Sequence, residues 1–100
     1  VVKVAGENKI PLVCNDPASA SRGCVTGLGL DYPDNGYQSV VNMAIPILKG
    51  EKKADDIPIA KQQNNIIAIN TAAAEQQGVT IPDSLKSQAK QTFDTITPKQ

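Results

Sequence analysis

One stretch of this chain runs from Leu12 to Gly36 as LVCNDPASASRGCVTGLGLDYPDNG and shows the same pattern twice. An apolar run is followed by an acidic residue, a nearby proline and helix-compatible residues, first around Asp16 and again around Asp31. The pattern predicts a strand, a polar loop and a helix start, twice in succession. In open α/β sheets, ligands bind just outside the carboxyl ends of strands, so we expect the two acids to face one crevice.

The segments around this stretch continue the alternation of strands and helices. Proline opens three of the helical segments, and glycine closes most of them. The order indicates an α/β fold with parallel strand pairing. We expect strands at Ile10–Cys14, Val25–Leu30, Ile57–Ile59 and Ile66–Ile69, helices at Pro17–Arg22, Pro33–Lys49 and Thr71–Gln77, and a final helix from Pro82 that carries Leu85, Ala89, Phe93 and Ile96.

The longest predicted helix, Pro33–Lys49, contains two features that oppose a regular helix. Pro46 removes a backbone donor, so it should kink the helix or end it early. The YPDNG sequence at the start would also suit a turn, because Asn35-Gly36 is a strong turn signal. One face of this helix is apolar; it consists of Tyr37, Val40, Val41, Ala44, Ile45 and Leu48.

Composition argues against several classes of function. The 100 residues carry ten basic and ten acidic side chains, and the aromatic residues are Phe93, Tyr32 and Tyr37. A basic stripe and a stacking platform are both missing, so nucleic acid is not an expected partner. The sequence has no His, the commonest general base and metal ligand. We therefore expect a protein that is not an enzyme and needs no metal or cofactor.

The two cysteines, Cys14 and Cys24, are too few for a structural zinc site. Their spacing alone does not show whether they form a disulfide. Both occupy apolar, strand-like positions, where free cysteine is commonly buried as a small apolar residue. We expect two free thiols.

Two roles are open for each acid, and the roles can coexist. Asp16 directly precedes Pro17, so it is suited to cap the following helix. It also follows a strand, where a carboxylate can meet a ligand. For Asp31 the capping role is the weaker one, because Tyr32 separates it from Pro33.

Gly27 and Gly29 place their missing side chains on one face of the second predicted strand. Glycine inside a strand often marks the close approach of a ligand or of another backbone. The pair is not a dinucleotide-binding fingerprint, because the third glycine and the helix that should open there are absent.

Four motifs resemble those of the extracytoplasmic solute-binding proteins of ABC importers. Together they cover nearly all of the chain, and the last two are the most specific in order and spacing. The motifs are KIPLVCND (Lys9–Asp16), GLGLDY (Gly27–Tyr32), ILKGEKKADDIPI (Ile47–Ile59) and IAIN-TAAAEQQGVTIPDSL (Ile67–Leu85).

The resemblance implies two α/β lobes joined by a hinge, with a ligand in the cleft between them. It points to the branch that handles amino acids, aromatic ones included, and other small organic solutes. Residues 1–100 would then be a partial domain, the C-terminal third of such a protein. The start of the chain agrees, since Val1–Glu7 reads as a helix end without its beginning. Alone, we expect a swapped or otherwise associated homo-oligomer rather than a cooperatively melting monomer.

The resemblance also implies a site. Asp16 matches a cleft-lining polar residue, and Asp31 matches the place where the chain crosses between lobes. Both acids would pair with a ligand ammonium or accept hydrogen bonds from ligand hydroxyls. Polar contacts and a ring face would come from Asn15, Ser19 and Tyr32.

The expected function is the solute-binding component of an ABC import system, with a small-molecule ligand and the ABC permease subunits as partners. Such a protein is extracytoplasmic, either periplasmic or a membrane-anchored lipoprotein. The alternative is a sensory or interaction domain of the same fold without a transport role.

Overall fold

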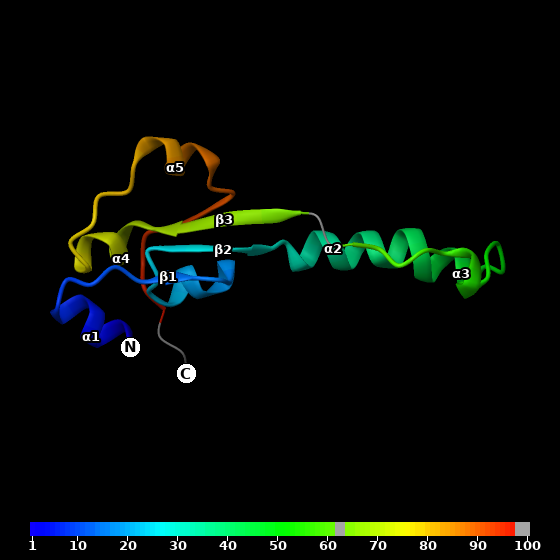
Figure 1. Cartoon of the computed structure of the whole chain (residues 1–100), viewed down its shortest axis with the longest axis horizontal. Helices are drawn as coiled ribbons and strands as arrows, with labels where there is room; N and C mark the ends of the chain where they lie inside the picture. The colour runs from blue at the N-terminus through cyan, green and yellow to red at the C-terminus, as the bar shows by residue number, and fades with distance from the viewer. Residues whose placement is uncertain (62–63, 98–100) are drawn as a thin grey trace. The chain divides into compact units, whose positions relative to one another are not determined.

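The structure is a computed structural model that describes residues 1–61 and 64–97. The chain forms two compact units, Val1–Gly29 with Asn65–Gln100, and Leu30–Asn64. The elements of Figure 1 are α1 (Val2–Glu7), β1 (Val13–Cys14), the 3₁₀-helix η1 (Pro17–Arg22), β2 (Thr26–Leu30), α2 (Tyr32–Ser39), the π-helix η2 (Val40–Ala44), α3 (Ile45–Leu48), the 3₁₀-helix η3 (Ala54–Asp56), β3 (Asn65–Asn70), α4 (Thr71–Gln76), α5 (Asp83–Gln88) and β4 (Gln91–Phe93).

The strands form one four-stranded sheet in the order β1-β2-β3-β4. β1 pairs with β2, and β3 pairs with β4, in both cases parallel. β2 and β3 run in opposite directions (Figure 1). The Asn70 N–H donates to the Val25 carbonyl, and one residue further along the chain the Thr26 hydroxyl donates to the carbonyl of Ala68, which comes earlier in β3. The expected α/β class, with a sheet dominated by parallel pairing, is confirmed.

The two faces of β3 contact different parts of the first unit. Ile67 and Ile69 belong to the apolar cluster, in which Leu85 of α5 also packs. Asn70, of the opposite parity, donates instead to the carbonyl of Ala20 in η1. Figure 1 shows α5 on one side of β3 and η1 on the other. The alternation follows from the two-residue period of a strand. The buried centre of the cluster is Val25, Ile69, Ala74 and Ile81.

The final helix is shorter than the apolar spacing predicted. α5 ends at Gln88, and Gln91–Phe93 forms β4, so a continuous helix to Ile96 is wrong. Ala89 has an extended backbone, and the N–H of Lys90 donates to the carbonyl of Ile67. Residues 91–93 therefore pair with β3 instead of continuing the helix, since tertiary contacts override a weak local preference for helix.

In the second unit, residues 32–48 are helical throughout, so the alternative of a turn at YPDNG is excluded. The sequence predicts a kink or an early end at Pro46, and the early end does not occur, because α3 runs past Pro46 to Leu48. The segment just before Pro46 is π-helical, and the N–H of Ile45 donates to the carbonyl of Val40. Proline has no backbone N–H to donate, so a helix that continues through it must adjust its hydrogen bonds. The π-turn makes this adjustment by changing the hydrogen-bond spacing just before the proline ring.

The apolar side of this helical segment is not buried. Within residues 32–48, all of which the structure describes, no side chain is buried, and Leu48 is 85% exposed. The side chains of the predicted apolar face, Tyr37, Val40 and their neighbours, are therefore exposed in this chain. Ile57–Ile59 follows η3 without strand structure, so that predicted strand is wrong. No helix in the described residues has the length and apolar character to cross a membrane.

Candidate functional site

Residues 15–23, which hold three of the predicted ligand contacts and are called the ligand loop for that prediction, connect β1 to the residues before β2. The helical part of the loop is η1, with the predicted bounds Pro17–Arg22, Asp16 as N-cap and Gly23 as C-cap. The Asp16 carboxylate accepts from the Ala18 N–H at 3.4 Å and from the Ser19 hydroxyl at 3.2 Å. The structure thus brings Asp16 and Ser19 together and confirms the capping role of Asp16. A cap that is partly exposed still has oxygen lone pairs for a second partner.

The glycines of β2 explain where the ligand loop lies. A Cβ at Gly29 would lie 2.8 Å from Pro17 Cδ and 3.0 Å from the Asn15 carbonyl oxygen. A Cβ at Gly27 would likewise overlap the backbone of Asp16. The close approach predicted from these glycines is therefore real, and the partner is the backbone of Asn15–Pro17. The loop can lie this close to the neighbouring strand because both positions lack a side chain.

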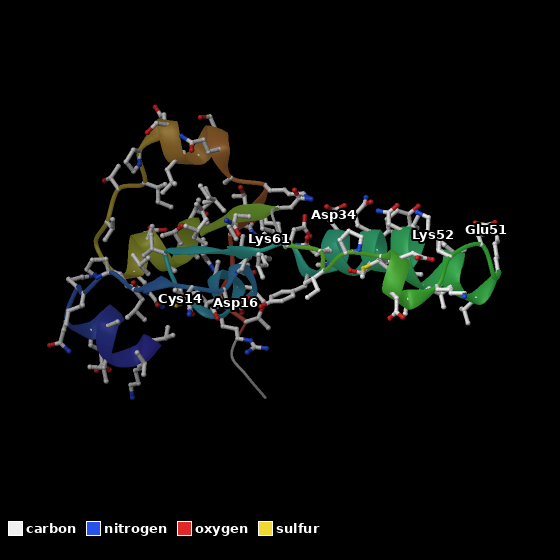
Figure 2. The ribbon with its side chains drawn as sticks, turned by 45° about the vertical axis from the view of Figure 1, so that its right-hand side comes forward. Cys14, Asp16, Asp34, Glu51, Lys52 and Lys61 are labelled. Atoms are coloured by element: carbon white, nitrogen blue, oxygen red, sulfur yellow. A yellow bond between two sulfur atoms is a disulfide. The ribbon has the colours of Figure 1, made fainter. Side chains whose placement is uncertain are left out.

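The two cysteines are joined in a disulfide, so the expectation of free thiols is wrong. Their Cα atoms are 6.1 Å apart, and the bridge closes the ligand loop at its base. β1 and β2 pair in parallel with Val13 opposite Thr26 and Cys14 opposite Gly27, so the two-residue β1 lies beside the start of β2, just after Cys24. Spacing alone could not reveal this, because parallel register sets the distance. Figure 2 shows Cys14 and Asp16 close together along the chain at the end of β1.

Two buried amides that the sequence did not single out also belong to this region. Asn70, the last residue of β3, caps α4, because its Oδ1 accepts from the Ala73 N–H at 3.0 Å. Gln77, the C-cap of the same helix α4, is fully buried. Glutamine is mostly exposed in proteins, so its full burial is a signal that only the structure provides.

The second unit holds the other predicted residues, Asp31 and Tyr32. Asp31 is the N-cap of α2, where its carboxylate accepts from the Asp34 N–H at 3.3 Å. The capping role that seemed weaker is thus present: Tyr32 takes the first helical position and Pro33 the second. Asp31 is only 6% exposed, whereas Tyr32 is 66% exposed and offers its ring to solvent. Asp34 and Asn64 are hydrogen-bonded to each other beside this cap.

The chemistry available is that of hydrogen bonding and charge. The ligand loop offers the Asp16 carboxylate, the Ser19 hydroxyl and the exposed amide side chain of Asn15. A carboxylate suits an ammonium group, and amide and hydroxyl groups can both donate and accept.

Comparisons with known proteins give a consistent result. Residues 1–93 match the family described as ABC transporter substrate binding protein. A tyrosine-binding protein of Clostridioides difficile is 40% identical over 70 residues, which is 70% of this chain and 20% of that protein.

Solved structures agree. The ABC domain in complex with L-Trp from Streptococcus pneumoniae has a TM-score of 0.72 and 28% identity, over 93% of this chain and 32% of that one. The ligand-free, open structure of a substrate binding protein with adhesive properties from Clostridium difficile has a TM-score of 0.72 and 26% identity, over 97% and 31%. A conserved domain protein from Vibrio cholerae has a TM-score of 0.68 and 32% identity, over 91% of this chain and 30% of that one. The chain thus spans 20% of its curated relative and about a third of each solved one.

Proposed function

Because this chain belongs to the ABC transporter substrate-binding protein family, we propose that the intact protein captures a free amino acid and delivers it to an ABC permease. The proposed ligand is aromatic, with L-tyrosine and L-tryptophan as the first candidates. Capture would take place outside the cytoplasm, in a cleft between the two lobes of the intact protein. Binding and release are its whole chemistry, without catalysis.

The observation that carries this proposal is the 40% identity to a protein named for binding tyrosine. The matched structure from Streptococcus pneumoniae, which holds L-Trp, supports the same ligand class. Two aromatic amino acids in two relatives favour the ligand class over other small organic solutes. The tyrosine-binding protein and the ligand-free substrate binding protein from Clostridium difficile are binding proteins by name, which favours a receptor over an enzyme.

The predicted residues supply groups that fit such a ligand. We propose that the Asp16 carboxylate pairs with the ligand ammonium, while Ser19 and Asn15 contribute polar contacts from the same loop. Asp31 would accept a further hydrogen bond, and the exposed ring of Tyr32 would contact the aromatic side chain. The capping bonds of Asp16 do not compete with this role, because a carboxylate has about four lone-pair sites.

Calorimetric titration of the intact protein with L-tyrosine and L-tryptophan tests the ligand class. The expected result is saturable binding of at least one of them, and binding of neither would overturn it. Uptake of labelled tyrosine by cells with and without the gene tests the transport role.

The site is tested with variants that keep the caps. Asparagine is as good an N-cap as aspartate, so Asp16→Asn and Asp31→Asn keep the cap and remove the charge. Each should weaken binding by roughly tenfold to a hundredfold, because hydrogen bonds to charged groups are the stronger ones. Asp83→Asn is the matched control, since it removes an exposed carboxylate of α5 that forms an ion pair with Lys86. Equal affinity in all three variants would remove both acids from the site.

A further inference from the structure

The side chain of Gln77 joins the two ends of the ligand loop. Its Oε1 accepts from the Leu12 N–H at 2.7 Å, and its Nε2 donates to the Gly23 carbonyl at 2.7 Å. Leu12 lies just before β1, and Gly23 ends η1, so the amide spans the base of the loop. Gln77 is 0% exposed, so both polar atoms of its side chain depend on these two bonds for partners.

The same base is closed by two further links. The Cys14–Cys24 disulfide joins the loop covalently, from the second residue after Leu12 to the residue after Gly23. Next to it, the Val25 N–H donates to the Leu12 carbonyl at 2.8 Å. Three different interactions therefore hold the two ends together, and two of them meet at Leu12.

The middle of the loop is held from the same helix. Asn70, the N-cap of α4, donates from Nδ2 to the Ala20 carbonyl at 2.7 Å. Gln77 is the C-cap of α4, so the two cap residues of one helix hold two points of η1. α4 itself is anchored through Ala73 and Ala74, which are buried. The ligand loop is thereby tied to the core of the first unit rather than standing free in solvent.

We propose that Gln77 is a positioning residue for ligand binding, a proposal that rests on the proposed function. It is buried and bonded at both ends of its amide, and it acts through the backbone that carries Asn15, Asp16 and Ser19. By fixing both ends of that backbone, it keeps the three side chains in one arrangement before the ligand arrives. A preorganised loop pays less ordering entropy on binding, which raises affinity without a new contact.

A loop-opening assay tests the positioning role without any ligand. The single arginine of the chain, Arg22, is exposed and lies beside Gly23, where the Gln77 amide binds. An arginine-specific protease must open the loop locally to cut the Arg22–Gly23 bond, and mass spectrometry after reduction identifies the cut. In the intact protein, Gln77→Met keeps the side-chain length and loses both hydrogen bonds. Cleavage should become about tenfold faster, because buried hydrogen bonds set the free energy of local opening.

Two further variants separate positioning from general stability. Gln77→Glu keeps an acceptor for the Leu12 N–H but, when ionised, has no donor for the Gly23 carbonyl. It should therefore also speed cleavage, and it replaces Gln77→Met in the assay if that variant does not fold. Leu85→Ala removes a core contact of α5, which lies on the other side of β3 from η1 (Figure 1). At a matched loss of melting temperature, it should leave cleavage after Arg22 unchanged. Equal cleavage in the Gln77 and Leu85 variants, or no acceleration in either Gln77 variant, would overturn the proposal.

Calorimetry with L-tyrosine and L-tryptophan completes the test. Gln77→Met should weaken binding by about fivefold or more relative to Leu85→Ala, since only the former releases the loop. Unchanged affinity alongside faster cleavage would show that the loop position does not matter for binding, and would also overturn the proposal. If the unmodified protein binds neither amino acid, the proposed function fails, and the cleavage assay still decides whether Gln77 holds the loop.

Discussion

Gly27 of β2 lies directly against the backbone of Asp16. A Cβ atom at position 27 would lie 3.0 Å from the Asp16 carbonyl carbon, closer still to its oxygen, and 3.1 Å from Pro17 Cα. These neighbours are backbone atoms, which cannot move aside as the end of a flexible side chain can. The strand glycine therefore sets how near the ligand loop comes to the sheet.

The first prediction is that Gly27→Ala displaces the loop. It should lower the free energy of unfolding by about 1–3 kcal/mol, the usual cost of overpacking, because β2 or the loop must shift. It should also weaken L-tyrosine binding, since Asp16 shifts with the loop. Denaturant unfolding and calorimetric titration of the intact protein measure the two effects.

Gly36→Ala provides the control for that variant. Gly36 is inside α2, and among the described residues no atom outside its own helix lies within 4 Å of a Cβ placed there. Alanine should therefore raise the unfolding free energy by about 0.5–1 kcal/mol through helix propensity alone. If the two alanine variants were equally stable, the close approach of Gly27 and Asp16 would be disproved.

The second prediction concerns the disulfide. In the unreduced, denatured 100-residue chain, thiol titration should find no reactive cysteine, and it should find two after reduction. In the intact protein, Cys14→Ala with Cys24→Ala should cost about 2–3 kcal/mol, the loop-closure entropy for a loop of this length. Two reactive thiols before reduction would show that the bridge does not form.

The third prediction separates capping from charge at Asp31. Asp31→Ala leaves the Asp34 N–H without its side-chain acceptor and should cost about 0.5–2 kcal/mol of stability. Asp31→Asn keeps an oxygen in the same place and should cost much less. Thermal melts of the intact protein compare the two variants, and an equal loss in both would mean that the charge, rather than the cap, stabilises α2.

The fourth prediction concerns the 100-residue chain studied alone. Its helical segment exposes large apolar side chains, including Tyr37 at 64% and Leu48 at 85%. Apolar surface of this kind favours association, so we expect oligomers in sedimentation experiments. The double variant Tyr37→Gln and Leu48→Gln should reduce the average mass.

Val1→Gln is the matched control for association, because Val1 is 94% exposed but lies outside that segment. It should leave the average mass unchanged. A monomer that melts cooperatively without any substitution would contradict the expectation of association.

Much of the local structure follows from short-range signals in the sequence. η1 begins after Asp16 and ends before Gly23, as predicted. A capping side chain and a residue with positive φ both act on adjacent backbone groups, so the sequence can indicate them. Asn70 caps α4 in the same way. The glycines of β2 indicated a close approach, although the identity of the approaching group was open.

Other features depend on segments that are far apart in the chain. β4 exists because β3 supplies hydrogen-bond partners more than twenty residues away, and no local pattern in Gln91–Phe93 indicates them. The π-turn before Pro46 is a backbone adjustment that residue types alone do not specify.

For the site itself, the sequence by itself determined which polar side chains follow the apolar strands and which of them can cap a helix. The tertiary structure alone decided that Cys14 meets Cys24 and that the amide of Gln77 spans Leu12 and Gly23. The physical reason is that capping requires a particular side chain within a few residues, whereas a disulfide or a buried amide bridge requires a distance. That distance is set by the register of β1 and β2 and by the packing of α4 beneath the loop, which emerge only once the whole unit has folded.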